Sequence, residues 1–134
     1  MKEHQKIMKG SAMNVAAGQF RLEDAVLEPF ELGPDALISG DPKLEIVALH
    51  RTADGTVLAG LFRSTPGEYY VSTPGDEVTL VRKGRLIITA DDGSVVDVRS
   101  GDVYTLAKGV RYTFKVVEDL EDYFVSSNID GPAS

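Results

Sequence analysis

Beyond Leu44 the sequence is a series of short runs rich in Val, Ile, Thr, Tyr and Phe, separated by turn residues. The runs arrive about every ten residues, which is typical of the strands of a β-sandwich or β-barrel. No segment there keeps the 3.6-residue period of an amphipathic helix. The predicted strands are Leu44–Arg51, Thr56–Arg63, Tyr69–Thr73, Val78–Arg82, Arg85–Thr89, Ser94–Val98, Val103–Leu106, Tyr112–Val117 and Tyr123–Ser126.

The connections between these runs favour antiparallel pairing. Asp54-Gly55, Lys83-Gly84 and Asp92-Gly93 supply the positive-φ residues that tight hairpin turns require. A rolled or closed barrel is favoured over an open sheet because closure limits the number of exposed strand edges. Prolines and glycines interrupt residues 20–42, and this segment is predicted to be an extended lead-in.

Length and composition predict one globular domain. The chain has 134 residues, of which 43% are hydrophobic and 26% charged, and one hydrophobic core is expected at this size. We predict an N-terminal arm over residues 1–18, flexible or docked on a second subunit, followed by a single domain over 19–134. The arm has no apolar segment of the kind found in secretory signals, so the cytoplasm is the expected compartment.

The charge balance argues against two classes of partner. Fourteen Lys and Arg against 21 Asp and Glu leave a net charge of −7, and an acidic surface repels nucleic-acid phosphates and anionic lipid. No apolar run approaches the roughly 20 residues that a membrane-spanning helix needs. The absence of cysteine excludes disulfides, thiolate nucleophiles and cysteine-based metal sites. We therefore expect neither nucleic acid nor a membrane as a partner.

Short motifs in a fixed order carry a family resemblance. They are Gly40-Asp41-Pro42, Gly60-Leu61-Phe62, Thr65-Pro66-Gly67, Asp76-Glu77 and Gly101-Asp102. Gly67, Glu77 and Gly84 fit the first conserved box of the cupin superfamily, and Gly101 and Gly109 fit the second. Over residues 38–126 the chain resembles small single-domain cupins related to ureidoglycine aminohydrolase and to the ethanolamine-utilisation cupin. The resemblance implies an all-β fold, an antiparallel jelly-roll barrel also called a double-stranded β-helix.

The chain departs from the cupin pattern at the metal ligands. The resemblance implies a metal held by three histidines and a glutamate, and the histidine positions here are Val71, Thr73 and Tyr112. His4 and His50 lie outside both boxes. Since first-row divalent metals prefer imidazole and carboxylate donors, we expect no bound cofactor, with a weakly held divalent metal left open.

Glu77 is the candidate general acid or base. Strand alternation places it on one face with Thr79 and Val81, and the cupin resemblance makes that face the barrel interior. Burial among apolar walls would raise its pKa, whereas a neighbouring arginine would hold it ionised. The alternatives are a hydrogen-bond anchor beside Tyr112 and a solvated carboxylate at the strand end.

Four further residues are candidate ligand contacts. Tyr69, Thr73 and Tyr112 are placed around the former metal position by the resemblance, where rings would give contact area and hydroxyls orientation. Arg63 could bind a carboxylate or ureido group through its planar fork. The alternatives are tyrosines that belong to the core and an arginine in solvent at the end of its strand.

Three functions follow from these residues. The first is metal-free binding of a small polar metabolite inside the barrel. The second is an enzyme resembling ureidoglycine aminohydrolase, acting on C–N bonds with Glu77 as acid or base. The third is a structural or regulatory protein whose barrel is filled by side chains. A homodimer is also expected, because Val78 and Leu80 alternate to the face opposite Glu77.

Overall fold

The computed structural model describes residues 16–131, and most of the predicted arm, residues 1–15, lies outside this range. Within it, nine strands pair antiparallel in one sheet after a single 3₁₀ turn. The elements are η1 (Leu22–Asp24), β1 (Glu28–Phe30), β2 (Leu37–Gly40), β3 (Leu44–Arg51), β4 (Leu58–Ser64), β5 (Gly67–Ser72), β6 (Asp76–Ala90), β7 (Val95–Arg99), β8 (Val103–Leu106) and β9 (Arg111–Ser127). The predicted all-β cupin-like fold is confirmed.

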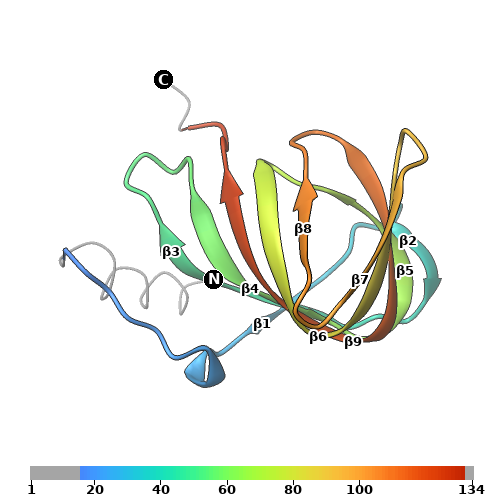
Figure 1. The fold of residues 1–134 in the computed structure, drawn as a ribbon, viewed down its shortest axis with the longest axis horizontal. Coiled ribbons are helices and arrows are strands. Elements are labelled where there is room, and N and C mark those ends of the chain that lie inside the picture. The colour runs from blue at the N-terminus through green and yellow to red at the C-terminus, as the bar shows by residue number, and fades with distance from the viewer. Residues whose placement is uncertain (1–15, 132–134) are drawn as a thin grey trace.

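Two long strands, β6 and β9, organise the sheet. They pair with each other along most of their length. The free edge of β9 pairs first with β5 and then with β4, and the free edge of β6 pairs with β8 and β7. Each long strand therefore serves two halves of the molecule, and the sheet curls around a concave inner face (Figure 1).

The link from β1 to β2 spans two edges of this sheet. β1 pairs with β3, and β2 pairs with β5. In the strand order β1-β3-β4-β9-β5-β2 the strands β1 and β2 are therefore the two terminal ones. The intervening residues 31–36 fold into a turn closed by a hydrogen bond from the Ala36 amide to the Gly33 carbonyl, and the Ala36 carbonyl accepts a bond from the Tyr70 amide. The link is thereby fixed to β5.

The turn predicted at Lys83-Gly84 is wrong. β6 runs straight through it with register shifts between Val81 and Leu86, which makes the site a β-bulge. Gly84 has φ +91°, and a Cβ there would lie 2.2 Å from the Asp119 carbonyl oxygen, so the position requires glycine.

The two predicted C-terminal strands likewise form one strand, β9. The other two predicted turns are confirmed. Asp54-Gly55 connects β3 to β4 and Asp92-Gly93 connects β6 to β7, with positive φ at both glycines.

The two faces of the sheet are packed differently. The inner face carries the main core, which includes Leu86, Ile88, Phe114 and Val116. On the outer face a smaller cluster of Val47, Leu49 and Leu61 is covered by apolar residues at 20–27. Val78 and Leu80 also point outward and are 54% and 40% exposed. The homodimer stays a prediction. No helix in residues 16–131 is long and apolar enough to cross a membrane.

Candidate functional site

A cavity of about 410 Å³ opens on the inner face of the sheet. It is bounded by inward side chains of β4, β5, β6, β8 and β9 and by the link between β1 and β2. Aromatic rings form much of its wall, among them Phe62, Tyr69, Tyr104, Phe114 and Phe124. A space of this size suits a small organic molecule.

Glu77 lines this cavity from the start of β6. It lies directly opposite Leu106 on one side and Ser126 on the other. Its carboxylate accepts a hydrogen bond of 3.2 Å from the Thr79 hydroxyl. Burial raises the pKa of Glu77 to about 6, while the Thr79 bond opposes the shift. This carboxyl group therefore titrates near neutral pH, as a general acid or base requires.

Asp122 is a second inward carboxyl group, which sequence reasoning missed. It lies on β9 opposite Phe62 and Val81, lines the cavity and is 2% exposed. The Tyr104 hydroxyl donates a 3.0 Å hydrogen bond to its Oδ2 atom. Burial raises the pKa of Asp122 to about 8; the Tyr104 bond opposes this, and the nearby carboxylates of Glu77 and Glu121 add to it.

One further polar side chain on the wall has no partner in the structure. Ser126 lies opposite Glu77 at the end of β9, and it is 2% exposed. Its Oγ atom is buried and makes no hydrogen bond within the described residues. Buried hydroxyls are rarely left in this state, since an unmade bond costs about 1–3 kcal/mol. Ser126 thus marks a point where a bound molecule can supply the missing partner.

Tyr69 and Thr73 also lie on the cavity wall, but their hydroxyls are engaged by the protein. The Tyr69 hydroxyl donates a 2.9 Å bond to the Ser64 hydroxyl, and burial raises the pKa of this tyrosine. Thr73 donates a 2.8 Å bond to the Gly75 carbonyl. Both residues line the cavity, and both can contribute contact area there.

The structure does not bring Tyr112 and Arg63 to the cavity. The hydroxyl of Tyr112 accepts a 2.7 Å bond from the Ala107 amide, and its ring belongs to the main core. Arg63 alternates with Phe62, which lines the cavity, so the arginine lies on the outer face. There its Nε donates a 2.8 Å bond to Glu121.

Glu121 holds two arginines on this outer face. It is 4% exposed, and its second carboxylate oxygen pairs with Arg82. The Arg63 and Arg82 side chains remain 41% and 32% exposed. Arg82 and Arg63 are therefore joined through Glu121 in one ion-pair network.

The donor set in the barrel does not fit a cupin metal. Val71 has no donor atom, and the hydroxyls of Thr73 and Tyr112 are held by backbone groups. His50 is exposed at the end of β3. Within residues 16–131 no three His, Cys, Asp or Glu side chains group closely enough to hold a metal ion. We derive no metal-dependent chemistry for this site.

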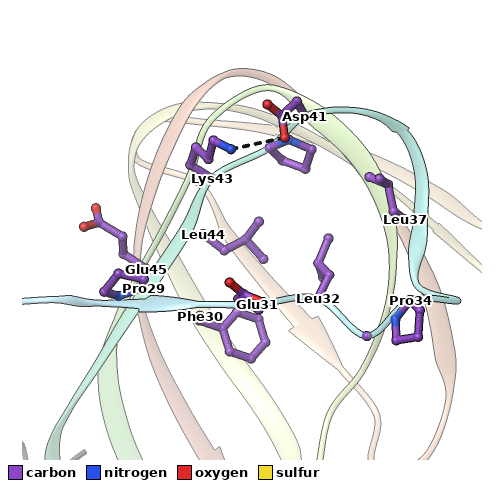
Figure 2. Close-up of a pocket in the computed structure, with 12 residues that line it drawn as sticks. Pro29, Phe30, Glu31, Leu32, Pro34, Leu37, Asp41, Lys43, Leu44 and Glu45 are labelled. Atoms are coloured by element: carbon purple, nitrogen blue, oxygen red, sulfur yellow. Dashed lines mark hydrogen bonds and ion pairs between the residues drawn. The ribbon is translucent and has the colours of Figure 1, made fainter.

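A second hollow lies beside the first, at the rim of the sheet. It has a volume of about 470 Å³ and is lined by residues of the β1–β2 link and the start of β3. Figure 2 shows Phe30, Leu32 and Leu44 gathered in it and the Asp41–Lys43 ion pair at its edge. These three apolar residues also line the cavity of the inner face, so the two spaces share part of their wall. The charged residues of the rim hollow face solvent, unlike Asp122.

The arrangement agrees with comparisons to known proteins. The EutQ-like cupin domain family matches residues 51–122, more than half of the chain. The chain belongs to this family. The matched segment runs from the end of β3 into β9 and includes Tyr69, Glu77, Tyr104 and Asp122. A search of curated proteins found no match.

Solved structures show the same fold at low identity. A DUF861-family protein from Pseudomonas syringae pv. tomato is 23% identical with a TM-score of 0.69, over 78% of this chain and 45% of that one. Clostridium difficile EutQ is 23% identical with a TM-score of 0.58, over 72% and 78%. The Cnp3 cupin domain of Schizosaccharomyces pombe is 13% identical with a TM-score of 0.62, over 82% and 73%. At these identities the likeness concerns the fold.

Proposed function

We propose that this cupin binds a small polar organic molecule in the cavity of its inner face. The observation that carries the proposal is a space of about 410 Å³ into which an unpartnered buried hydroxyl, Ser126, and two carboxyl groups, Glu77 and Asp122, project. A barrel that serves only as a scaffold would be filled by side chains, because voids and unsatisfied polar groups both destabilise a core.

The division of the wall also supports binding. Rings such as Phe62 and Phe124 give a ligand apolar contact area, and both inward carboxyl groups lie on β6 and β9. Ligand sites usually combine an apolar wall with a few polar groups that fix orientation. No step of the proposal depends on a metal.

Catalysis is the second candidate function. Burial raises the pKa of Glu77 to about 6 and the pKa of Asp122 to about 8, both above the ordinary values of these groups. Two such groups facing one cavity could hold and move a proton during cleavage of a C–N bond. This is the class of reaction that the resemblance to ureidoglycine aminohydrolase implies. Glu77 would then be the base and Asp122 the neutral acid at neutral pH.

A screen with matched variants tests the binding proposal. The thermal midpoint is measured against a panel of small amides, ureides, amines and hydroxy acids. Val71 lines the cavity, so Val71→Phe fills part of it, whereas Val117→Phe adds the same ring at an exposed position of β9. We expect a panel compound to raise the midpoint of the wild type and of Val117→Phe, but not that of Val71→Phe.

Three results would count against these proposals. Binding is overturned if no panel compound raises the midpoint, or if Val71→Phe keeps its fold by circular dichroism and responds as the wild type does. Ammonia release from the same amides and ureides tests catalysis, with Glu77→Gln as the inactive variant. Equal release by Glu77→Gln and the wild type would remove the catalytic role of Glu77 while leaving binding in place.

A further inference from the structure

When its acids ionise, the cavity gains negative charge with no positive charge on its wall to balance it. Two of its lining residues, Glu77 and Asp122, are acids, and none of the described residues that line it is Lys, Arg or His. Arg63 and Arg82 are occupied by Glu121 on the outer face. A buried carboxylate with no cation is costly, which is why such groups are normally paired.

The polar groups at this end of the cavity are mainly acceptors. Thr79 and Tyr104 direct their hydroxyl hydrogens to Glu77 and Asp122. Each carboxylate accepts one such bond at one oxygen, and the buried Ser126 hydroxyl has no partner. A carboxylate offers up to about four acceptor sites, so a donor with several hydrogens is what this group of side chains lacks.

The remaining wall suits the rest of a cation. The rings of Phe62, Tyr69, Phe114 and Phe124 line the cavity. Aromatic rings attract ammonium groups placed over their faces. The charge, the hydrogen-bonding groups and the aromatic lining of the cavity therefore all favour a ligand with a cationic group.

We infer that the ligand of this cavity carries a protonated amine, held by Asp122 and Glu77, with its carbon skeleton against the aromatic wall. The inference rests on the proposed binding function and names its ligand class. An ammonium supplies up to three N–H donors to these two carboxylates, and its charge balances the acids as they ionise.

The predicted pH dependence follows from the groups around Asp122. These are Glu77 on β6, Tyr104 on β8, Tyr69 on β5 and, acting across the sheet, Glu121 on its own strand. Below about pH 6 both inward acids hold protons and an ammonium gains little. Between about pH 6 and pH 8.5 they ionise, so an amine should bind more tightly while releasing protons.

Three probes with one carbon skeleton test the charge requirement. They are 3-methylbutylamine, 3-methylbutan-1-ol and 3-methylbutanoate, titrated calorimetrically into the full chain at constant ionic strength and about pH 8.5, where an alkylamine stays protonated as a lysine does. We expect the amine to bind at least about tenfold more tightly than the alcohol and the carboxylate. Its affinity should fall at least about tenfold when the pH is lowered to about 5.5.

Variants assign the effect to the inward acid. Asp122→Asn should weaken amine binding at least about tenfold and bring its affinity close to that of the alcohol. Asp119→Asn removes the same charge from an exposed position of β9 and should change neither affinity. Should Asp122→Asn fail to fold, Glu77→Gln and the pH dependence of the wild type carry the same test, since Glu77→Gln and a lower pH should each weaken amine binding more than alcohol binding.

The outcomes distinguish failure of the amine inference from failure of the proposed binding function. If the alcohol or the carboxylate binds as tightly as the amine, or if only neutral or anionic panel compounds bind, the amine inference is overturned and the binding function stands. If neither the three probes nor the panel compounds bind, the binding function itself is overturned.

Discussion

Two adjacent residues of β9 show how differently the faces of this sheet treat a buried carboxyl group. Glu121 and Asp122 are 4% and 2% exposed, and they point to opposite faces because side chains alternate along a strand. Glu121 meets Arg63 and Arg82. Asp122 meets the hydroxyl of Tyr104 and an open cavity. The outer acid is neutralised by the protein, and the inner acid is left for something else to neutralise.

Removing the outer acid should have the largest effect on stability. Glu121→Gln leaves two arginines facing a neutral amide, and breaking a buried ion pair is strongly destabilising. Because Arg63 and Arg82 keep 41% and 32% exposure, we expect a loss of about 2–4 kcal/mol in the free energy of unfolding, measured by urea denaturation at neutral pH. Asp119→Asn is the control. A loss no larger than that of the control would show that the outer network contributes nothing.

The inner acids should make the free protein less stable as the pH rises. The folded-state pKa values of Asp122 and Glu77, about 8 and about 6, exceed their ordinary values of 3.8 and 4.5. Between these limits the folded chain holds protons that the unfolded chain has released, so stability falls as pH rises through this window and levels off above about pH 8. The expected fall is on the order of a few kcal/mol.

Asp122→Asn identifies the source of this pH dependence. An amide cannot ionise, so the variant should lose most of the slope and be more stable than the wild type by on the order of 2 kcal/mol at about pH 9. Urea denaturation across the pH range is the measurement. An unchanged slope in this variant would contradict the assignment of the raised pKa to Asp122.

Tyr104→Phe should have the smallest effect. It removes the hydrogen bond to Asp122, which contributes about 1 kcal/mol, and somewhat more once Asp122 is ionised. Since that bond lowers the pKa of Asp122, its loss should also move the midpoint of the pH dependence upward. Tyr123→Phe, on the opposite face of β9, provides the comparison. A downward movement of the midpoint would contradict the conclusion that the Tyr104 hydrogen bond lowers the pKa of Asp122.

Much of the fold could be predicted from the sequence. β3 and β8 begin and end at the predicted residues, Leu44–Arg51 and Val103–Leu106, because clear turn chemistry flanks them. Lys83-Gly84 was misread because a positive-φ glycine serves both a hairpin and a bulge. Only the long-range pairing of β6 with β9 distinguishes the two.

The site was predicted in part for a related reason. Alternation from Glu77 placed the inward face of β6 correctly, including Thr79. Asp122 lies in the mostly acidic run Glu118–Asp122, broken only by Leu120, which resembles a solvated connection. Its inward direction follows only if β9 continues through that run. Once that continuity is assumed, alternation counted back from Phe124 and Ser126 gives the direction.

The position of β9 has a consequence for how the chain acquires its shape. This strand is the last in order among the described residues, yet it lies between β6 on one side and β4 and β5 on the other. During synthesis β4, β5 and β6 keep hydrogen-bonding edges unpaired until β9 has left the ribosome. A nascent chain stalled before residue 111 therefore presents open strand edges to its neighbours, and the emergence of β9 pairs all three strands in one step.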